Sequence, residues 1–385
     1  MIRRTFGVVE KIYEERPGLQ EILVRCSAEQ TGVNSAVSPS VDLQRPAVNL
    51  TELTGHVVVG DRVELNTVAV ELNLGTGGQD FVVTVLDRLP EPFTPPGHII
   101  KMRYTPHQTA VLAIEAPESP FHQAIAGFTS LDETPVVCFE LHSQLPVICS
   151  ALSWALAQHG LKARVVYIMT DGAALSLPLS RWLPRLKSLG LLTSTISAGQ
   201  AFGGDYEAIN LYSAMAAAKE ALNADVIVVG QGPGNVGTGT RLGFSGVDQG
   251  LAVNAAASLE GAPIFVPRIS FGDSRTRHIG LSHHTITNLK TVIRASALLP
   301  IPRLSKHDLQ KLFSVLEDCG IMDLHDVITV DADKGLKAFE DTGLKVTTMG
   351  RDLSVERPFF LAAAAAGLLA AQLAEIRMQH SHARK

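Results

Sequence analysis

The sequence predicts an α/β protein in which a small all-β, barrel-like domain precedes a mostly parallel, Rossmann-like sheet with flanking helices. Two observations lead to this fold class. Over the first ninety residues, apolar and polar side chains alternate in short runs separated by glycine-rich turns, as in a small barrel or sandwich. From residue 131 onward, short apolar runs alternate with helical segments, which is the rhythm of βαβ units around a parallel sheet.

Composition supports a large folded core and limits the classes of partner. The chain has 385 residues, of which 46% are hydrophobic and 18% charged, so wholesale disorder is excluded and two domains are expected. The net charge of −5 and the 5% content of aromatic residues argue against a nucleic-acid-binding role. A small-molecule partner fits this composition better than nucleic acid does.

Cysteine usage and the absence of targeting signals predict a cytoplasmic protein. The four cysteines lie far apart and form no C-x-x-C pair, so no disulfide framework is expected. The N-terminus does not resemble a signal peptide. The alanine-rich run Phe359 to Leu373 is shorter than the roughly 20 apolar residues of a bilayer span, so a buried helix is expected there. The last six residues are expected to be a loose tail.

Alternating apolar residues predict the strands of the first domain. They form four sets: Ile22 and Val24; Val63 and Leu65; Val68, Val70 and Leu72; and Phe81, Val83 and Val85. Between the second and third sets the alternation shifts by one residue, which suggests a turn or bulge near Asn66 and Thr67. Prolines at positions 90, 92, 95 and 96 then predict a domain boundary, which divides the chain into residues 1–95 and 96–385.

The second domain alternates predicted strands and helices. Strands are predicted at residues 136–141, 164–169, 192–197, 225–229, 264–269, 326–330 and 345–349. Helices are predicted at residues 147–159, 177–189, 207–222, 250–259, 285–297, 307–319 and 335–342, with Asp205 as the N-cap of the third.

Polar side chains follow each predicted strand, where ligands bind in open α/β sheets. His142 follows the first strand, Asp171 the second and Asp205 the third. Asp273, Arg275 and Arg277 follow the strand at 264–269. The alternative is that these segments are ordinary turns and caps, which use the same residue types. Taken together, they favour a site at the carboxyl edge of the sheet.

The glycine run from Gly230 to Gly246 is the sharpest local signal. Glycines let backbone N–H groups approach a phosphate or carboxylate, so an anion-binding loop is predicted from Gly230, Gly232, Gly234, Gly237, Thr238, Gly239, Thr240 and Arg241. A dinucleotide site is not favoured, because Pro233 removes a donor and Arg268 replaces the expected acidic residue. No cofactor is therefore assigned. The alternative is an active-site flap or a packing loop.

Histidines cluster at positions 278, 283 and 284. His283 is the expected proton-transfer residue, because imidazole titrates nearest to neutrality. Adjacent histidines are expected to point apart, so His283 and His284 are not expected to share a ligand. A metal site joining His283 to His142, Asp171 or Asp205 lacks any H-x-x-x-H or H-E-x-x-H pattern, and no metal is assigned. The alternative is that Ser282 caps a helix beside a solvent-exposed histidine.

Three segments and two turns together resemble a known family. They are Gly203-Gly-Asp-Tyr-Glu-Ala-Ile-Asn210, the glycine run with Gly-Thr-Gly-Thr240, Gly280-Leu-Ser-His-His-Thr285, Leu65-Asn-Thr67 and Leu74-Gly-Thr-Gly-Gly78. The chain resembles a family of bacterial proteins known as domain of unknown function 3866, over almost its whole length. The resemblance implies a bacterial cytosolic protein and carries no activity, cofactor or catalytic residue.

Two functional hypotheses follow from the residues. The first is an enzyme that acts on a small anionic metabolite, phosphorylated or not, with His283, His142, Asp171 and Asp205 as catalytic candidates and Arg241 or Arg277 as the neutralising charge. The second is a non-catalytic module that senses a metabolite or assembles with itself. The sequence leaves open whether the chain is an enzyme. A homo-oligomer, without a membrane or nucleic-acid partner, is expected on general grounds.

Overall fold

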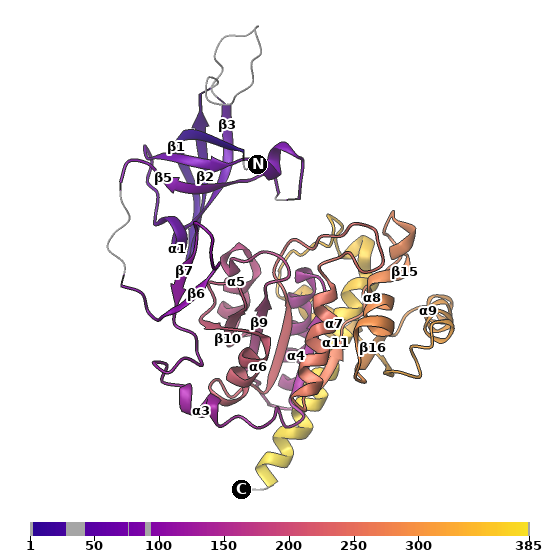
Figure 1. Ribbon diagram of the computed structural model, residues 1–385. Helices are drawn as coiled ribbons and strands as arrows, with labels where there is room; N and C mark the ends of the chain where they lie inside the picture. The colour runs from indigo at the N-terminus through magenta and orange to yellow at the C-terminus, as the bar shows by residue number, and fades with distance from the viewer. Residues whose placement is uncertain (1–2, 28–42, 76, 89–93, 384–385) are drawn as a thin grey trace. The chain divides into compact units, whose positions relative to one another are not determined.

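The computed structural model describes residues 3–27, 43–75, 77–88 and 94–383 (Figure 1). The chain forms two compact units, Met1–Ala110 and Val111–Lys385. All four cysteines are free, as expected, and Cys26, Cys138 and Cys149 are buried.

The first unit contains a closed five-stranded barrel, which confirms the predicted all-β architecture. Its strands are β1 (Arg4–Arg16), β2 (Leu19–Cys26), β3 (Leu43–Leu50), β4 (Arg62–Asn66) and β5 (Asp80–Val85), and they close in the order β1-β2-β3-β5-β4. All neighbours are antiparallel except β3 and β5. Ile22, Val24, Val63 and Leu65 are buried inside, so the alternation predicted the core face of β2 and β4.

The prediction of a strand at Val68, Val70 and Leu72 is wrong. This segment is instead a short helix, α2 (Val68–Glu71). The Asn66 side chain accepts a hydrogen bond from the Val68 N–H at 3.2 Å, and Thr67 donates to Glu71 at 2.6 Å. These local bonds turn the chain at the position where the alternation shifts phase. A second short helix, α1 (Thr51–Thr54), follows β3.

The structure divides the chain later than the prolines suggested. The strands β6 (Ile99–Lys101) and β7 (Thr109–Val111) pair with each other, and the first unit ends at Ala110 rather than at residue 95. Pro95 and Ile100 line a cavity of about 830 Å³ together with Val83 of β5. The segment after the prolines therefore packs on the barrel. Pro90 and Pro92 lie outside the described residues.

The second unit is built on an eight-stranded sheet, all of whose strand pairs are parallel, as the strand–helix rhythm predicted. The sheet order is β11-β10-β9-β12-β8-β13-β16-β17. The strands are β8 (Pro135–Phe139), β9 (Val165–Thr170), β10 (Ser194–Ala198), β11 (Tyr206–Ala208), β12 (Val226–Gln231), β13 (Ala262–Phe265), β16 (Leu298–Pro302) and β17 (Asp326–Val330).

Helices cover both faces of this sheet and bury one core on each side. One core takes α4 (Leu145–Ala157), α5 (Trp182–Ser188), α10 (Asp333–Asp341) and α11 (Leu353–Ala383). The other core is formed by α6 (Leu211–Glu220), α7 (Val247–Ser258), α9 (Lys306–Asp318) and the segment around α8 (His283–Thr287). A short helix, α3 (His122–Ala126), precedes the sheet, and a hairpin of β14 (Ile269–Ser270) and β15 (Gly280–Leu281) follows β13.

The predicted N-cap at Asp205 is wrong. The segment from Tyr206 first forms β11, and α6 begins only at Leu211. Asn210 caps it, since its side-chain oxygen accepts a hydrogen bond from the Ser213 N–H at 3.0 Å. Asp205 instead accepts a hydrogen bond from the Thr195 N–H at 2.8 Å, near the start of β10.

The strand expected at residues 345–349 is also wrong. Thr348 and Arg351 exchange backbone hydrogen bonds of 2.8 and 2.9 Å across a tight turn. Met349 and Gly350 both have positive φ, 50° and 79°, which an extended strand does not allow. Apolar alternation alone did not reveal this turn.

The C-terminal helix α11 belongs to the core, as its alanine content predicted. It is the one helix of the described residues that is long and apolar enough to cross a membrane, but 72% of its apolar window is buried. Gly367 allows close contact with α4, because a Cβ there would lie 2.4 Å from the Ile148 carbonyl oxygen. The helix extends to Ala383, so the loose tail expected from residue 380 is wrong up to that point (Figure 1).

Candidate metal centre

The connections of the sheet define one crevice at its carboxyl edge. The neighbouring strands β8 and β12 lead to α4 and α7, which contribute to the cores on opposite faces of the sheet. Loops that leave adjacent strands toward opposite faces open a crevice between them, and this is where ligands bind in open α/β sheets. The residues directly after these strands are therefore the first candidates for a site.

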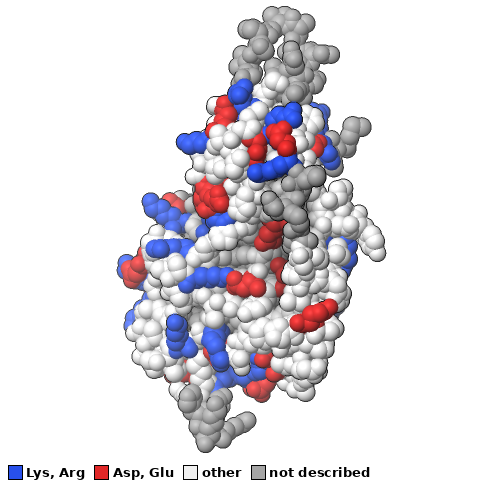
Figure 2. Space-filling model, turned by 90° about the vertical axis from the view of Figure 1, so that its left-hand side faces the viewer, with Lys and Arg blue, Asp and Glu red and all other residues white. Residues whose placement is uncertain are grey.

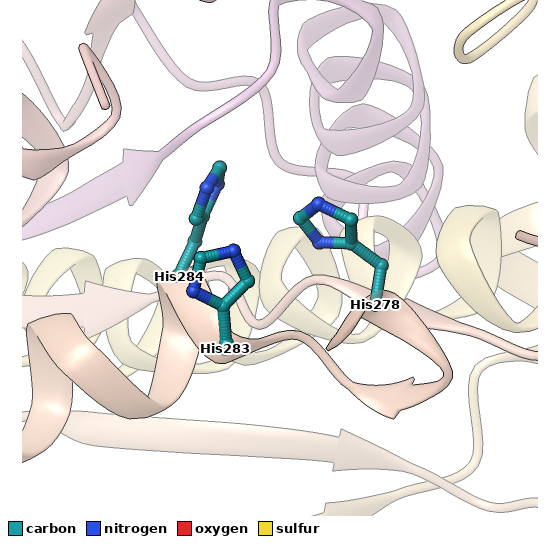
Figure 3. A group of neighbouring side chains, drawn as sticks. All are labelled: His278, His283 and His284. Carbon is teal, nitrogen blue, oxygen red and sulfur yellow. The ribbon is translucent and has the colours of Figure 1, made fainter. Parts of the chain in front are cut away.

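Three histidine side chains meet beside this crevice (Figure 3). His278 ends a short 3-10 turn (Thr276–His278), and His283 and His284 form the first turn of α8. Ring centroids lie 4.9 Å apart for His278 and each of the others, and 4.3 Å apart for His283 and His284. One ring nitrogen from each histidine lies within 4.8 Å of those of the other two. The prediction that the adjacent side chains of His283 and His284 point apart is wrong, because their rings lie side by side in this turn.

Local structure explains why the histidines converge. Ser282 is the N-cap of α8, and its hydroxyl accepts a hydrogen bond from the His284 N–H at 3.2 Å. The same hydroxyl lies 2.8 Å from His278 Nδ1. The hairpin of β14 and β15 closes through pairing of Ile269 with Leu281 and so returns the chain to this cap. The helix cap expected at Ser282 is thus confirmed, and the cap also fixes a histidine.

Glu140 orients the third histidine. It is the first residue beyond β8, it is buried, and its Oε1 accepts a hydrogen bond from His284 Nδ1 at 2.5 Å. Asn235 Nδ2 donates to the same oxygen at 2.8 Å, and the Arg268 guanidinium lies 3.6 Å away. Burial alone would raise the pKa of Glu140, but His284 and Arg268 outweigh it and hold the pKa below its ordinary value. Glu140 occupies the Nδ1 side of the His284 ring, so Nε2 is the nitrogen that faces a ligand.

The other two histidines are neutral at neutral pH. Burial and the charges of Arg268 and Arg275 lower the pKa of His278 to about 3. Burial, together with the charge of Arg277, lowers the pKa of His283 to about 4. Neutral imidazole is the form that binds metal ions. Among the described residues, buried His283 Nε2 and Glu140 Oε2 have no hydrogen-bond partner, so two polar atoms at this centre lack a ligand.

The glycine run forms a folded loop against the histidines. Gly237 bridges to Phe244, and the N–H groups of Thr238 and Ser245 donate back to Gly243 and Val236 at 2.8 and 2.9 Å. Phe244 stacks on the His284 ring with centroids 3.8 Å apart and planes 3° apart. A Cβ on Gly237 would lie 4.0 Å from His284 Nε2. The loop therefore packs over the histidine cluster, and several of its N–H groups are already used.

The other glycines of the run are each required by a close contact or by a positive φ angle. Gly230 lies within β12, where a Cβ would collide with the Phe139 ring at 2.4 Å, and Gly232 lies against Ala174 and Met169. Gly234 and Gly239 have positive φ values of 104° and 80°. Thr238 and Thr240 bond each other at 2.9 Å.

The remaining predicted site residues lie in different places. His142 is buried next to Ser180 and Tyr167, at 2.6 and 3.5 Å. Asp171 is exposed at the carboxyl end of β9 and accepts a hydrogen bond from the Gln200 N–H at 2.9 Å. Asp205 pairs with Lys187 at 2.5 Å, near the opposite end of the sheet. Arg241 reaches Thr291 at 3.4 Å. The structure therefore leaves His283 and Asp171 near the crevice and Asp205 away from it.

Most of the nearby arginines are already paired. Asp273 is fully buried and pairs with Arg275 at 2.8 Å and Arg351 at 2.9 Å. Arg351 also pairs with Glu356 at 2.5 Å, at the kink where α11 begins. The hydrogen bond from Arg275, together with the charge of Arg351, holds the pKa of Asp273 well below its ordinary range. Arg351 is thus part of a structural network.

A groove of about 810 Å³ opens beside His283, between the β15–α8 segment and α9. Its lining includes Phe271, Leu281 and Val315, and the cationic Arg277 and Lys311. None of the described residues that line it is acidic. The groove thus combines an apolar wall with positive charge next to one of the three histidines.

Residues 46–367 match a protein family described as a protein of unknown function, DUF3866. The chain belongs to this family. No curated protein and no solved structure matches this DUF3866 protein. The family supplies no residue roles, so the site rests on its own geometry.

Glu140 and the spatial grouping of the histidines were not predicted from the sequence of this DUF3866 protein. The predicted strand extended to Leu141, which placed Glu140 inside it and left His142 as the first polar residue after it. The strand in fact ends at Phe139, and a glutamate directly after an apolar run was the available signal. The spacing of His278 and His283 carried no such signal, because a hairpin and a cap, rather than a helix face, bring them together.

Proposed function

We propose that this protein is a metal-dependent enzyme that acts on a small anionic metabolite at the carboxyl edge of its sheet. His278, His283 and His284 would hold a divalent transition metal. The observation that carries the proposal is the convergence of three histidines, one of which a buried carboxylate fixes in the metal-binding tautomer.

The donor set fits such a metal. Zinc accepts neutral histidine nitrogens, and three protein ligands leave a fourth position for water or substrate. The nitrogens of a tetrahedral site lie about 3.4 Å apart, given Zn–N bonds of about 2.0–2.1 Å. The present separations of up to 4.8 Å require the nitrogens to approach one another by up to about 1.4 Å, which small side-chain rotations supply. The bound ion would polarise a carbonyl or phosphoryl oxygen or acidify a water molecule.

The groove beside His283 supports an anionic substrate. Arg277 is exposed there, and none of the described ion pairs includes Arg277 or Lys311. Elsewhere the surface is mixed: acidic and basic side chains are interspersed over the face shown in Figure 2. We therefore assign the apolar wall to the body of the substrate and the two cations to its carboxylate or phosphate group.

Isothermal titration of Zn²⁺ into the chelator-treated full chain tests the metal site. One site is expected, with affinity reduced at least tenfold in His283→Ala and in His284→Ala. His159→Ala is the matched control, because His159 is exposed on a different part of the unit and pairs with Glu375 at 3.1 Å. Absence of binding to the native chain, or equal binding by all variants, contradicts the proposal.

A panel of phosphate and carboxylate esters then tests catalysis. Metal-dependent hydrolysis that falls in Arg277→Ala, with Zn²⁺ affinity unchanged, supports an enzyme. Stoichiometric metal binding with no turnover of any ester favours the non-catalytic sensing module instead.

A further inference from the structure

A second group of oxygen atoms lies near the Glu140 backbone, to which Gln231 is hydrogen-bonded. Asp248 is in the first turn of α7, where its carboxylate accepts a hydrogen bond from the Thr170 hydroxyl at the end of β9. Asp171 follows Thr170, but its Oδ2 accepts a hydrogen bond from the Gln200 N–H at 2.9 Å and lies against Gly199, after β10. Asp248 forms no ion pair with any Lys or Arg among the described residues. Its carboxylate therefore lies at the end of β9 without a cation.

An orphaned amide oxygen points into the same place. Gln231 ends β12, is 2% exposed, and donates through Nε2 to the Glu140 carbonyl oxygen at 3.1 Å. Its Oε1 is buried and has no hydrogen-bond partner among the described residues. A buried carbonyl oxygen without a donor is costly unless a ligand completes it.

Gly172 shows that these atoms surround one small space. A Cβ built on this glycine would lie 2.9 Å from Asp248 Oδ2 and 3.0 Å from Gln231 Oε1. Its φ is not in the left-handed region, so glycine is not required by the backbone there. The absence of a side chain keeps open a space that a carboxylate and an amide oxygen both face.

We propose that Asp248 and Gln231 Oε1 form a binding site for a hard divalent cation such as Mg²⁺ or Mn²⁺. Carboxylate and amide oxygens are the ligands that these ions prefer, with water completing the octahedron. Thr170 orients Asp248 by its hydrogen bond. The site goes beyond the histidine centre, which offers nitrogen ligands and prefers zinc-like ions. Gln231 connects the two sites, because it donates to the backbone of Glu140.

A bound cation also accounts for two unpaired groups. Asp248 is half-buried, and its carboxylate has no cation beside it among the described residues. A bound Mg²⁺ would neutralise this carboxylate and give Gln231 Oε1 a partner. The crevice between β8 and β12 then has a cation on its β9 side.

Mn²⁺ provides the test, because electron paramagnetic resonance of free Mn²⁺ measures binding directly. The chelator-treated full chain is titrated with Mn²⁺ alone, and then with Mg²⁺ as competitor. One site is expected, with affinity reduced at least tenfold in Asp248→Asn and in Gly172→Ala. Gly75→Ala is the matched control, because a Cβ there meets nothing within 4 Å.

His284→Ala separates this inference from the proposed function. It is expected to bind Mn²⁺ as the native chain does, while losing Zn²⁺. If the native chain binds no Mn²⁺, or if folded Asp248→Asn binds it unchanged, the inference is overturned and Asp248 is only a partner of Thr170. Thermal unfolding of each variant checks folding, and Asp248→Asn decides should Gly172→Ala not fold.

Discussion

Glu140 is the residue on which the histidine centre depends. Its Oε1 accepts from His284 and Asn235, and its buried charge faces Arg268. Glu140→Gln keeps the size of the side chain but removes the charge that holds the proton on His284 Nδ1. We expect Zn²⁺ affinity to fall by roughly 10–100-fold, the range for loss of such a supporting carboxylate.

Titration calorimetry checks this prediction, and Asn235→Ala separates charge from packing. The asparagine variant removes a hydrogen bond to Glu140 but leaves the charge, so its loss of affinity should be smaller. Unchanged affinity in Glu140→Gln would show that the carboxylate does not orient the ligand.

His142 has a structural role that pH can reveal. Burial lowers its pKa from 6.5 to about 4, although the Gln231 backbone acts in the opposite direction. The unfolded chain therefore binds a proton that the folded chain does not. This residue's contribution to stability is fully present above pH 6.5 and is lost as the pH falls toward 4, by up to about 3 kcal/mol.

Urea unfolding between pH 7 and 4.5 measures this effect. His142→Gln, which retains a partner for Ser180, should lose less stability on acidification than the native chain does. His307→Gln, at an exposed position, serves as the control and should follow the native chain. Parallel curves for native and His142→Gln would assign the acid sensitivity to other groups.

Single residues were partly predictable. Residue type and position between the predicted strands and helices were enough to predict that Ser282 caps a helix and that Asp171 lies at the carboxyl edge of the sheet. Asp205 has the right residue type for a cap, but Asn210 caps α6 because a further strand comes first. Sequence patterns do not show which of two plausible caps the tertiary structure uses.

At the scale of elements, close packing of α11 on α4 gives a direct prediction. A Cβ on Gly367 would lie 2.4 Å from the Ile148 carbonyl oxygen and 3.1 Å from the Ala151 Cβ. Gly367→Ala must push the helices apart, so we expect a loss of about 1–3 kcal/mol despite the higher helix propensity of alanine.

Urea denaturation with a matched glycine variant checks the packing. A Cβ on Gly127, at the end of α3, would meet its nearest atoms at 3.5 Å, so Gly127→Ala should change stability little. Equal stability of both variants would mean that α11 and α4 are packed less tightly than described.

The strand at Leu298–Pro302 was not among the predicted elements. It contains Pro300 and Pro302, and proline lacks the N–H that a central strand donates. Two residues apart, both prolines lack the donor on the same side of the strand. Accordingly β16 pairs with β13 only at Leu298, whereas it pairs with β17 throughout its length.

At the scale of the whole molecule, the two architectures were predictable because each has its own period. A barrel alternates every second residue, while a parallel sheet with helices alternates buried strands with helical faces. The histidine centre was not predictable, because residue 140 follows β8, residue 235 follows β12 and residues 278–284 follow β13, so that only the tertiary structure brings them together. A homo-oligomer and a cytoplasmic location remain predictions.

The metal content of the purified protein tests the central claim most directly. We would purify the full chain without chelator, dialyse it, and measure metals by inductively coupled plasma mass spectrometry, beside His284→Ala and His159→Ala. We expect close to one zinc-like ion per chain in the native protein and in His159→Ala, and its loss in His284→Ala. No transition metal in the native chain even after incubation with Zn²⁺, or the same content in all three proteins, would contradict the histidine centre.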